Sequence, residues 1–254
     1  MSICRRLLAS LDGHEVLLET GLAKKLGGKG ARIQEMNVDV LITVGGDGTI
    51  LRSLQRNNAP IFGINAGVLG FLTEIPAKDL EAGIARVISG DYVIDGRLKL
   101  KTTVGGKRLY DSMNETVVHT ANIAKIRQFE VYVDDQIVMN VRADGIIVAT
   151  PTGSTCYAMS VGAPIIDPRV EAFVIAPMAP FKFAAKPIVV PASSRIKLRL
   201  DRPKPCVAVV DGQEMRQMKG DEEVEFSLSE NVARFVSFGR DFYSRMREKL
   251  MGSL

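Results

Sequence analysis

Asp47 stands among glycines in the segment Gly45-Gly46-Asp47-Gly48-Thr49, directly after an apolar run. Glycine lets a backbone approach a ligand closely, and the free N–H groups at the start of a helix favour a phosphate. A carboxylate beside phosphates repels them unless it meets a metal ion or a substrate hydroxyl. The segment therefore indicates phosphate binding. The alternative is an ordinary strand-to-helix turn in which Asp47 or Thr49 caps the helix.

A second polar segment runs from Thr150 to Ser160, directly after the apolar residues Ile146 to Ala149. Its hydroxyls and the free N–H groups of a helix start could bind phosphate or ribose, and Tyr157 could stack on a base. A capping box without a ligand is the competing interpretation. Cys156 is expected to pack as a small residue, because no histidine or basic neighbour is evident in the sequence to activate its thiol.

Asn114 and Glu115 interrupt a strand-like run. An amide and a carboxylate at a strand edge could hold a ribose or a base edge by hydrogen bonds, although an ordinary turn explains the pair as well. Two histidines leave little room for a catalytic triad or a metal cluster, and His119 is interpreted as a strand-end residue. The Gly-x-x-x-x-Gly-Lys-Ser/Thr phosphate loop is absent, and Leu51 occupies the place of the third glycine of a dinucleotide fingerprint.

The elements that must position these residues alternate between helix and strand up to about residue 95. Apolar spacing predicts helices over residues 3–11, 49–57 and 78–89, strands over 38–44 and 60–64, and a Lys- and Gly-rich loop over 22–31. This alternation is typical of an α/β domain with a parallel sheet.

Short alternating runs follow, and they predict a mostly antiparallel β-rich domain. The hairpin signal is Val133-Asp134-Asp135-Gln136. A helix is expected over 241–250. The predicted strands cover residues 97–104, 107–113, 115–119, 128–133, 136–141, 145–149, 195–200, 206–210, 223–228 and 232–236.

The composition limits the classes of partner and the cellular location that are expected. A net charge of +4 with scattered Lys and Arg suits anionic substrates such as nucleotides and argues against nucleic acid. Three distant cysteines argue against disulfides or zinc and favour a reducing, cytoplasmic location. Lysines and prolines interrupt the apolar stretch 173–192, so it is not expected to span a membrane.

Taken together, these segments resemble the NAD kinases. The glycine turn alone is shared with diacylglycerol, sphingosine and phosphofructo-kinases, whereas the run from Asp144 to Thr155 is specific to the family. The matching features, in the family's order, are Gly45-Gly46-Asp47-Gly48-Thr49; Asn65-x-Gly67-x-Leu69-Gly70-Phe71-Leu72; Asn114-Glu115; Asp144-Gly145-x-Ile147-Val148-Ala149-Thr150-Pro151-Thr152-Gly153-Ser154-Thr155; Tyr157 with Ser160; and Pro187-Ile188-Val189-Val190-Pro191.

The resemblance implies transfer of the terminal phosphoryl of ATP, or of polyphosphate, to the adenosine ribose 2′-hydroxyl of NAD, with Mg²⁺ or another divalent cation. It implies an α/β domain over residues 1–95 and 238–254, to which the last helix returns, and a β-rich NAD-binding domain over 96–237. It also implies a homodimer or homotetramer. Neither nucleic acid nor a membrane is an expected partner.

Residue roles follow from the same resemblance. Asp47 would orient or deprotonate the 2′-hydroxyl, beside Gly48. Phe71 would pack near the adenine, Asn114 and Glu115 would hold the adenosine and ribose, and Asp144 would contact the nicotinamide end. Further expected contacts to the dinucleotide are Thr155, Cys156, Tyr157, Ala158, Met159 and Ser160, with Lys125, Arg142 and Gln213 as weaker matches; Gly45, Gly46 and Thr49 form the phosphate-donor turn.

Three departures from the family pattern are expected to matter. The chain opens near the family's first helix, so the first strand of the parallel sheet is expected to be missing, through a shortened gene start or an altered sheet edge. Phe181 stands where many relatives have histidine, and Cys156 replaces the usual alanine. Two alternatives to a kinase of NAD remain: a dinucleotide-binding sensor with impaired catalysis, and a lipid or sugar kinase that shares only the glycine turn.

Overall fold

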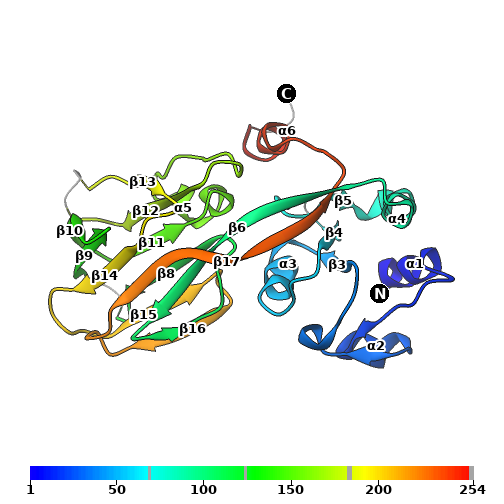
Figure 1. Ribbon diagram of the computed structural model, residues 1–254, viewed down its shortest axis with the longest axis horizontal. Coiled ribbons are helices and arrows are strands. Elements are labelled where there is room, and N and C mark those ends of the chain that lie inside the picture. Colours follow the sequence, from blue (N-terminus) through cyan, green and yellow to red (C-terminus); the bar gives the residue numbers. More distant parts are fainter. Residues whose placement is uncertain (68–69, 123–124, 182–184, 252–254) are drawn as a thin grey trace. The chain divides into compact units, whose positions relative to one another are not determined.

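The structure is a computed structural model of the 254-residue chain, and it describes residues 1–67, 70–122, 125–181 and 185–251. The chain divides into two compact units, a first unit of Met1–Gly96 with Ala233–Leu254 and a second unit of Arg97–Val232. The two boundaries between the units fall within long strands (Figure 1). Strand β6 (Val93–Val104) begins in the first unit and ends in the second, and β17 (Val224–Ser237) begins in the second and ends in the first.

A short parallel sheet forms the centre of the first unit, as the alternation of helix and strand predicted. Strand β3 (Leu41–Gly45) pairs in parallel with β4 (Ile61–Asn65), which also pairs with β5 (Ile75–Pro76) and, through Ile61, with Phe235 at the end of β17. Every residue of β4 is buried, as expected for a strand covered on both faces.

The helices of the first unit are α1 (Ser2–Ser10), α2 (Thr20–Leu26), α3 (Asp47–Leu54), α4 (Leu80–Ser89) and α6 (Phe242–Met246), the last followed by a π-helical turn at Arg247–Met251. Shorter elements are the parallel pair β1 (Leu18–Glu19) and β2 (Gly30–Ala31), and 3-10 turns at Ile33–Glu35 and Ala77–Asp79.

The loop predicted over residues 22–31 is wrong in its first half, which is helix α2. The Glu19 carboxylate accepts the N–H groups of Gly21 and Leu22 at 2.8 and 3.1 Å and so caps the helix start. Gly27 ends the helix with φ of 77°. The glycines that suggested a loop therefore lie at the helix end, where a left-handed backbone favours glycine.

Two antiparallel sheets form the second unit, which confirms the predicted β-rich fold. One sheet has the order β10 (Gln136–Ala143), β9 (Arg127–Val133), β14 (Ile196–Leu200) and β17; β6 also pairs with β17 and with β7 (Lys107–Arg108). The other has the order β13 (Ile188–Pro191), β12 (Ala172–Met178), β11 (Gly145–Ala149), β8 (Glu115–Thr120), β15 (Cys206–Val210) and β16 (Glu214–Met218).

The predicted hairpin at residues 133–136 joins β9 to β10. Val133 pairs with Gln136, and both turn residues have positive φ, 48° at Asp134 and 65° at Asp135. This is the backbone of a type I′ turn, which suits the twist of the flanking strands and which aspartate tolerates.

Strand β11 of the six-stranded sheet packs against a hydrophobic cluster on each of its two faces. All five of its residues are buried. Ile146 and Val148 belong to the large core that also contains Phe129 of β9, whereas Ile147 and Ala149 belong to a smaller cluster with Ala158. Because side chains alternate along a strand, the smaller cluster lies on the outer face of this sheet. That face carries the 3-10 turn Thr152–Thr155 and the short helix α5 (Tyr157–Ser160).

Within the described part of the chain, no helix has both the length and the apolar character needed to cross a membrane.

Candidate functional site

The glycine turn of the first unit joins β3 directly to α3. The helix begins at Asp47, two residues before the predicted start, with Gly46 as its N-cap. A Cβ at Gly45 would lie 2.4 Å from Thr49 Oγ1, so the fold itself requires this glycine. A Cβ at Gly46 or Gly48 would meet no atom within 4 Å, and neither residue has positive φ. The fold does not require these two glycines, and the turn is open to a ligand above them.

The Asp47 carboxylate points to the loop after β4. Its Oδ2 accepts the N–H of Phe71 at 2.7 Å, and its Oδ1 accepts the N–H of Leu72 at 3.1 Å. A carboxylate offers about four acceptor positions, so it retains the capacity to accept a proton or a hydrogen bond from a substrate hydroxyl. The structure thus brings Asp47 and Phe71 together, and it gives the aspartate a fixed orientation.

Gly70 leaves the space that this orientation needs. A Cβ at Gly70 would lie 1.8 Å from Asp47 Oδ1 and 2.5 Å from its Cγ. We expect Gly70→Ala to rotate the carboxylate away from its two amide donors. If Asp47 has the catalytic role that the resemblance implies, the variant should lower kcat about tenfold to a hundredfold, because a small misplacement of a reacting group is costly. Steady-state kinetics and a thermal melt measure this. Unchanged kcat in the folded variant would contradict the orientation argument.

In the second unit, Asp211 fixes the Asn114–Glu115 pair. Its Oδ2 accepts the N–H of Met113 at 2.8 Å, and its Oδ1 accepts the N–H groups of Asn114 at 2.8 Å and Glu115 at 3.1 Å. Asp211 lies in the turn between β15 and β16 with φ of 49°, and its side chain is buried. A buried carboxylate with three amide donors is well satisfied and holds the peptide backbone rigidly.

Burial raises the pKa of two neighbouring carboxyl groups, those of Glu115 and Asp211. Desolvation, with the charge of Asp211 as a second cause, raises the pKa of Glu115 to about 8. Desolvation also raises the pKa of Asp211 to about 6, against the hydrogen bonds from the three amides. Glu115 is therefore mostly protonated at neutral pH and can donate a hydrogen bond. Asn114 Oδ1 and Glu115 Oε2 are buried, and among the described residues neither has a hydrogen-bond partner.

Glu115→Gln is expected to stabilise the protein more at pH 8 than at pH 5. The pKa of Glu115 in the folded protein is about 8, above its ordinary value of 4.5, so the folded state holds a proton that the unfolded state releases. Stability is therefore full below pH 4.5 and falls as the pH rises toward 8. Glutamine removes this loss. Urea unfolding of both proteins at the two pH values measures the difference, and an equal effect at both would contradict the shift.

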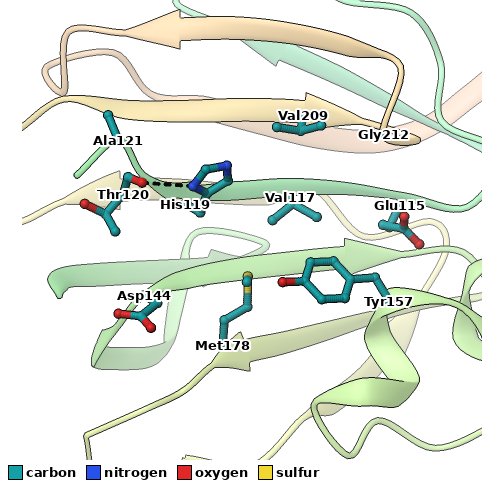
Figure 2. Close-up of a pocket in the computed structure, with 10 residues that line it drawn as sticks. All are labelled: Glu115, Val117, His119, Thr120, Ala121, Asp144, Tyr157, Met178, Val209 and Gly212. Carbon is teal, nitrogen blue, oxygen red and sulfur yellow. Dashed lines mark hydrogen bonds between the residues drawn. The ribbon is translucent and has the colours of Figure 1, made fainter. Parts of the chain in front are cut away.

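A cavity of about 480 Å³ opens beside Glu115 on the outer face of the six-stranded sheet. Figure 2 shows Glu115, Val117 and His119 along β8, with Asp144 and Met178 opposite and the Tyr157 ring at one end. The cavity thus brings together three predicted site residues, Glu115, Asp144 and Tyr157. Carboxyl, phenol and imidazole groups on an otherwise apolar floor are typical of a small-molecule site.

The hydroxyl-rich segment after β11 is held largely by its own backbone contacts. Thr150 Oγ1 donates to the carbonyl of Met113 at 2.6 Å, and its backbone N–H donates to the carbonyl of Asn114 at 2.8 Å. Ser154 Oγ donates to Pro151 at 2.6 Å, and Ser160 Oγ donates to Tyr157 at 2.8 Å. Thr150 holds the start of the segment against Met113 and Asn114, whereas the two serines bond within the segment. All three hydroxyls keep only acceptor capacity for a ligand.

The other predicted contacts differ in exposure. Lys125, Arg142, Ser160 and Gln213 are exposed; Cys156 and Met159 are half-buried; Thr155 and Ala158 are buried. The Arg142 guanidinium lies 5.3 Å from the centroid of the exposed Phe181 ring. Phe71 is half-buried, and the Lys249 ammonium lies 4.4 Å from its ring centroid. Their roles toward a dinucleotide remain predictions.

Sequence reasoning missed two residues of this site. His119, interpreted as a strand-end residue, lines the cavity, and its Nδ1 lies 2.9 Å from the carbonyl oxygen of Thr120 (Figure 2). The signal was its spacing, since Glu115, Val117 and His119 share one face of a strand. No signal in the sequence selects Asp211, because nothing local relates it to Asn114.

Known proteins match both units. Residues 5–92 match the ATP-NAD kinase N-terminal domain and residues 113–238 match the ATP-NAD kinase C-terminal domain. The NAD kinase of Thermoplasma volcanium is 43% identical over 93% of this chain and 88% of its own, and that of Thermoplasma acidophilum is 42% identical over 98% and 94%.

Solved structures agree. A crystal structure of an NAD kinase from Archaeoglobus fulgidus in complex with ATP matches with a TM-score of 0.80 and 29% identity, over 96% of this chain and 93% of that one. Yeast NADH kinase complexed with NADH shares the fold at a TM-score of 0.91 and 22% identity, over 99% and 83%. With both units matched and relatives more than 40% identical over nearly the whole chain, this protein belongs to the NAD kinase family.

Proposed function

We propose that the chain is an NAD kinase, which transfers the terminal phosphoryl of ATP to the adenosine ribose 2′-hydroxyl of NAD and releases NADP and ADP. The observation that carries this is the Asp47 carboxylate, which two backbone amides hold beside an open glycine turn at a helix start. Polyphosphate is a second donor to be tested, since the family's members differ in this respect.

Phosphoryl transfer requires the protein to position the two substrates and to neutralise charge, and it does not require a strong base. The 2′-oxygen forms a bond to the γ-phosphorus, the bond from that phosphorus to the bridging oxygen breaks, and ADP leaves. The hydroxyl proton passes to the Asp47 carboxylate. The N–H groups at the start of α3, above Gly46 and Gly48, would bind phosphate oxygens of the donor.

A divalent cation fits this arrangement as a companion of the donor. Among the described residues, no group of three or more His, Cys, Asp or Glu side chains could hold a metal ion. Mg²⁺ is commonly bound by substrate phosphates and water with one or two carboxylates, and Asp47 is the carboxylate at this turn. When bound, the cation would neutralise charge on the transferred phosphoryl.

The second unit would bind the dinucleotide. Asn114 Oδ1 and Oε2 of the protonated Glu115 carboxyl are buried atoms without a partner among the described residues, and they would pair with the adenosine and its ribose. Tyr157, half-exposed at the cavity, would stack on a ring of the ligand, and Asp144 would contact the nicotinamide end.

A direct assay tests the proposal. Purified protein is mixed with NAD, ATP and Mg²⁺, and NADP is measured with an NADP-specific dehydrogenase; parallel reactions replace ATP by polyphosphate, NAD by NADH, or omit the cation. NADP formation that depends on ATP supports the kinase. Measurable NAD binding without NADP would instead favour a dinucleotide sensor, and phosphorylation of a lipid or sugar in its place would reject NAD as the acceptor.

A cytoplasmic location and a homodimer or homotetramer complete the proposal. Family membership and the scattered cysteines support them. Light scattering at assay concentration tests the oligomer, and a monomer that remains fully active would overturn it.

A further inference from the structure

The C-terminal helix α6 contacts the loop that orients Asp47. Arg245 Nη1 donates to the carbonyl of Phe71 at 3.2 Å and to the carbonyl of Thr73 at 3.0 Å. Its Nη2 donates to the Glu74 carboxylate. The pair is well covered, with side-chain exposures of 14% for Arg245 and 5% for Glu74. One guanidinium thus satisfies two backbone carbonyls and one carboxylate of the same loop, a fixed geometry that its planar donors allow.

Glu74 ties this contact to the rest of the first unit. Its Oε1 accepts the backbone N–H of Phe238 at 2.7 Å, in the segment that leads from β17 to α6. Removing one member of such a buried pair leaves a charge without compensation, so each side chain depends on the other. The loop after β4 is therefore attached to the chain's C-terminal segment through buried polar groups.

A single peptide group joins Arg245 to Asp47. The carbonyl of Phe71 accepts from Arg245 at 3.2 Å, and the N–H of Leu72, on the same peptide, donates to Asp47 Oδ1 at 3.1 Å. The positive charge on the carbonyl side polarises this peptide and strengthens its N–H as a donor, because hydrogen bonds in a chain reinforce one another. The guanidinium also fixes the plane of the peptide, and hence the direction of the N–H.

We propose that Arg245 is a positioning residue for phosphoryl transfer, which acts by holding the Phe71–Leu72 peptide so that Leu72 N–H fixes the Asp47 carboxylate. The proposal rests on the role given to Asp47 in the proposed function. It goes beyond that function by assigning the C-terminal helix a task in catalysis.

The same segment offers a matched control. Arg240 Nη2 donates to both Glu248 oxygens at 2.7 Å, and this ion pair is more exposed than that of Arg245 and Glu74, with side-chain exposures of 34% and 47%. Arg240→Ala therefore removes an arginine–glutamate contact close to α6 that does not involve the loop after β4. Exposed ion pairs contribute little to stability, so the control variant is expected to behave as wild type.

The first test is hydrogen exchange of the Phe71 and Leu72 amides in the folded full-length protein. We expect faster exchange at Leu72 in Arg245→Ala and wild-type exchange in Arg240→Ala. Arg245→Lys, whose ammonium is a point charge rather than a planar fork, is expected to keep the fold and still to speed exchange at Leu72. Wild-type exchange at Leu72 in both folded Arg245 variants would overturn the proposal.

The second test is kinetic. Arg245→Ala and Arg245→Lys are expected to lower kcat about tenfold while KM for NAD changes less than about twofold. In an Asp47→Asn background, adding Arg245→Lys is expected to lower kcat by less than about twofold further, because residues that act through one group are not additive. An equal loss in both backgrounds would mean that Arg245 acts independently of Asp47 and would overturn the proposal.

The outcomes separate the two ideas. Wild-type protein that forms no NADP would reject the proposed function, while hydrogen exchange would still decide whether Arg245 holds the Leu72 amide. Active wild-type protein with unchanged kcat in Arg245→Lys would reject the positioning role and leave the proposed function intact. If Arg245→Ala does not fold, the lysine variant decides both tests.

Discussion

Asp47→Asn is expected to lower kcat for NADP formation by about a hundredfold to ten-thousandfold, the range typical of removing a group that accepts a proton in the transition state. In the proposed reaction the carboxylate receives the hydroxyl proton, and an amide of the same size does not. Asparagine also has one acceptor oxygen where Asp47 uses two, so its NH₂ group faces either Phe71 N–H or Leu72 N–H. The carboxylate is thereby lost together with its fixed orientation.

The measurement is kcat and KM from NADP formation, together with calorimetric NAD binding. Because Asp47 is proposed to lie at the reacting hydroxyl rather than along the dinucleotide, NAD binding is expected to change much less than kcat. Asp39→Asn is the control, since Asp39 is exposed and lies just before the same strand. Full activity in folded Asp47→Asn would remove Asp47 from the chemistry.

Local sequence patterns predicted the fold well where the residue types suit the backbone conformation that the structure has. The glycine turn follows a strand of the parallel sheet and opens a helix, and the Asp134–Asp135 turn has the two positive φ values of a type I′ hairpin. Helix α2 was missed because its cap is a glutamate that accepts N–H groups two and three residues later, a contact that the glycine-rich composition conceals. Local composition fails where a single side chain decides the conformation.

The site was predictable only in its local parts. Asp47, Asn114 and Glu115 could be selected as candidate site residues because their neighbours in the sequence are unusual. The residues that hold them in position are distant in the sequence. Asp211 lies 97 residues after Asn114, and Arg245 lies 174 residues after Phe71. Periodicity carries no information on such pairs, because the side chains meet only after the sheets have formed. Asp211 even carries a misleading signal, since Asp-Gly between two strands already explains itself as a hairpin turn.

The two units use the same device. In each, a carboxylate accepts successive backbone N–H groups: Asp47 from Phe71 and Leu72, and Asp211 from Met113, Asn114 and Glu115. Such bonds to a charged acceptor are stronger than neutral ones. In the first unit the backbone orients the carboxylate, which is the proposed catalytic group. In the second unit the carboxylate orients the backbone that carries Asn114 and Glu115, the proposed ligand-binding residues.

Because Asp211 orients the backbone, its replacement is expected to affect both the stability of the protein and the binding of NAD. Asp211→Ala leaves the three amides of Met113, Asn114 and Glu115 buried without an acceptor, and it places an alanine at φ of 49°. We expect a loss of about 3 kcal/mol or more in the free energy of unfolding, because each unpaired buried amide costs about 1–3 kcal/mol. KM for NAD is expected to rise about tenfold or more, since the orientation of both side chains proposed to bind the ligand is lost.

Asp211→Asn separates the hydrogen bonds from the charge. Asparagine tolerates the left-handed backbone, and its oxygen can keep the bonds to Asn114 and Glu115, so the loss of stability is expected to be smaller than for alanine. Removing the charge of Asp211 also removes one cause of the raised Glu115 pKa. In this variant the decline of stability above pH 4.5 should therefore end below pH 8, as urea unfolding across this range would show.

Asp134→Asn provides the matched control for both Asp211 variants, because Asp134 has φ of 48° in the β9–β10 turn but is exposed. It is expected to change neither KM nor the pH dependence of unfolding. The prediction fails if Asp211→Ala binds NAD as wild type does, for then the Asn114–Glu115 pair needs no support from Asp211. It fails in its second part if Asp211→Asn leaves the pH dependence unchanged, because the charge beside Glu115 would then have no effect on that carboxyl.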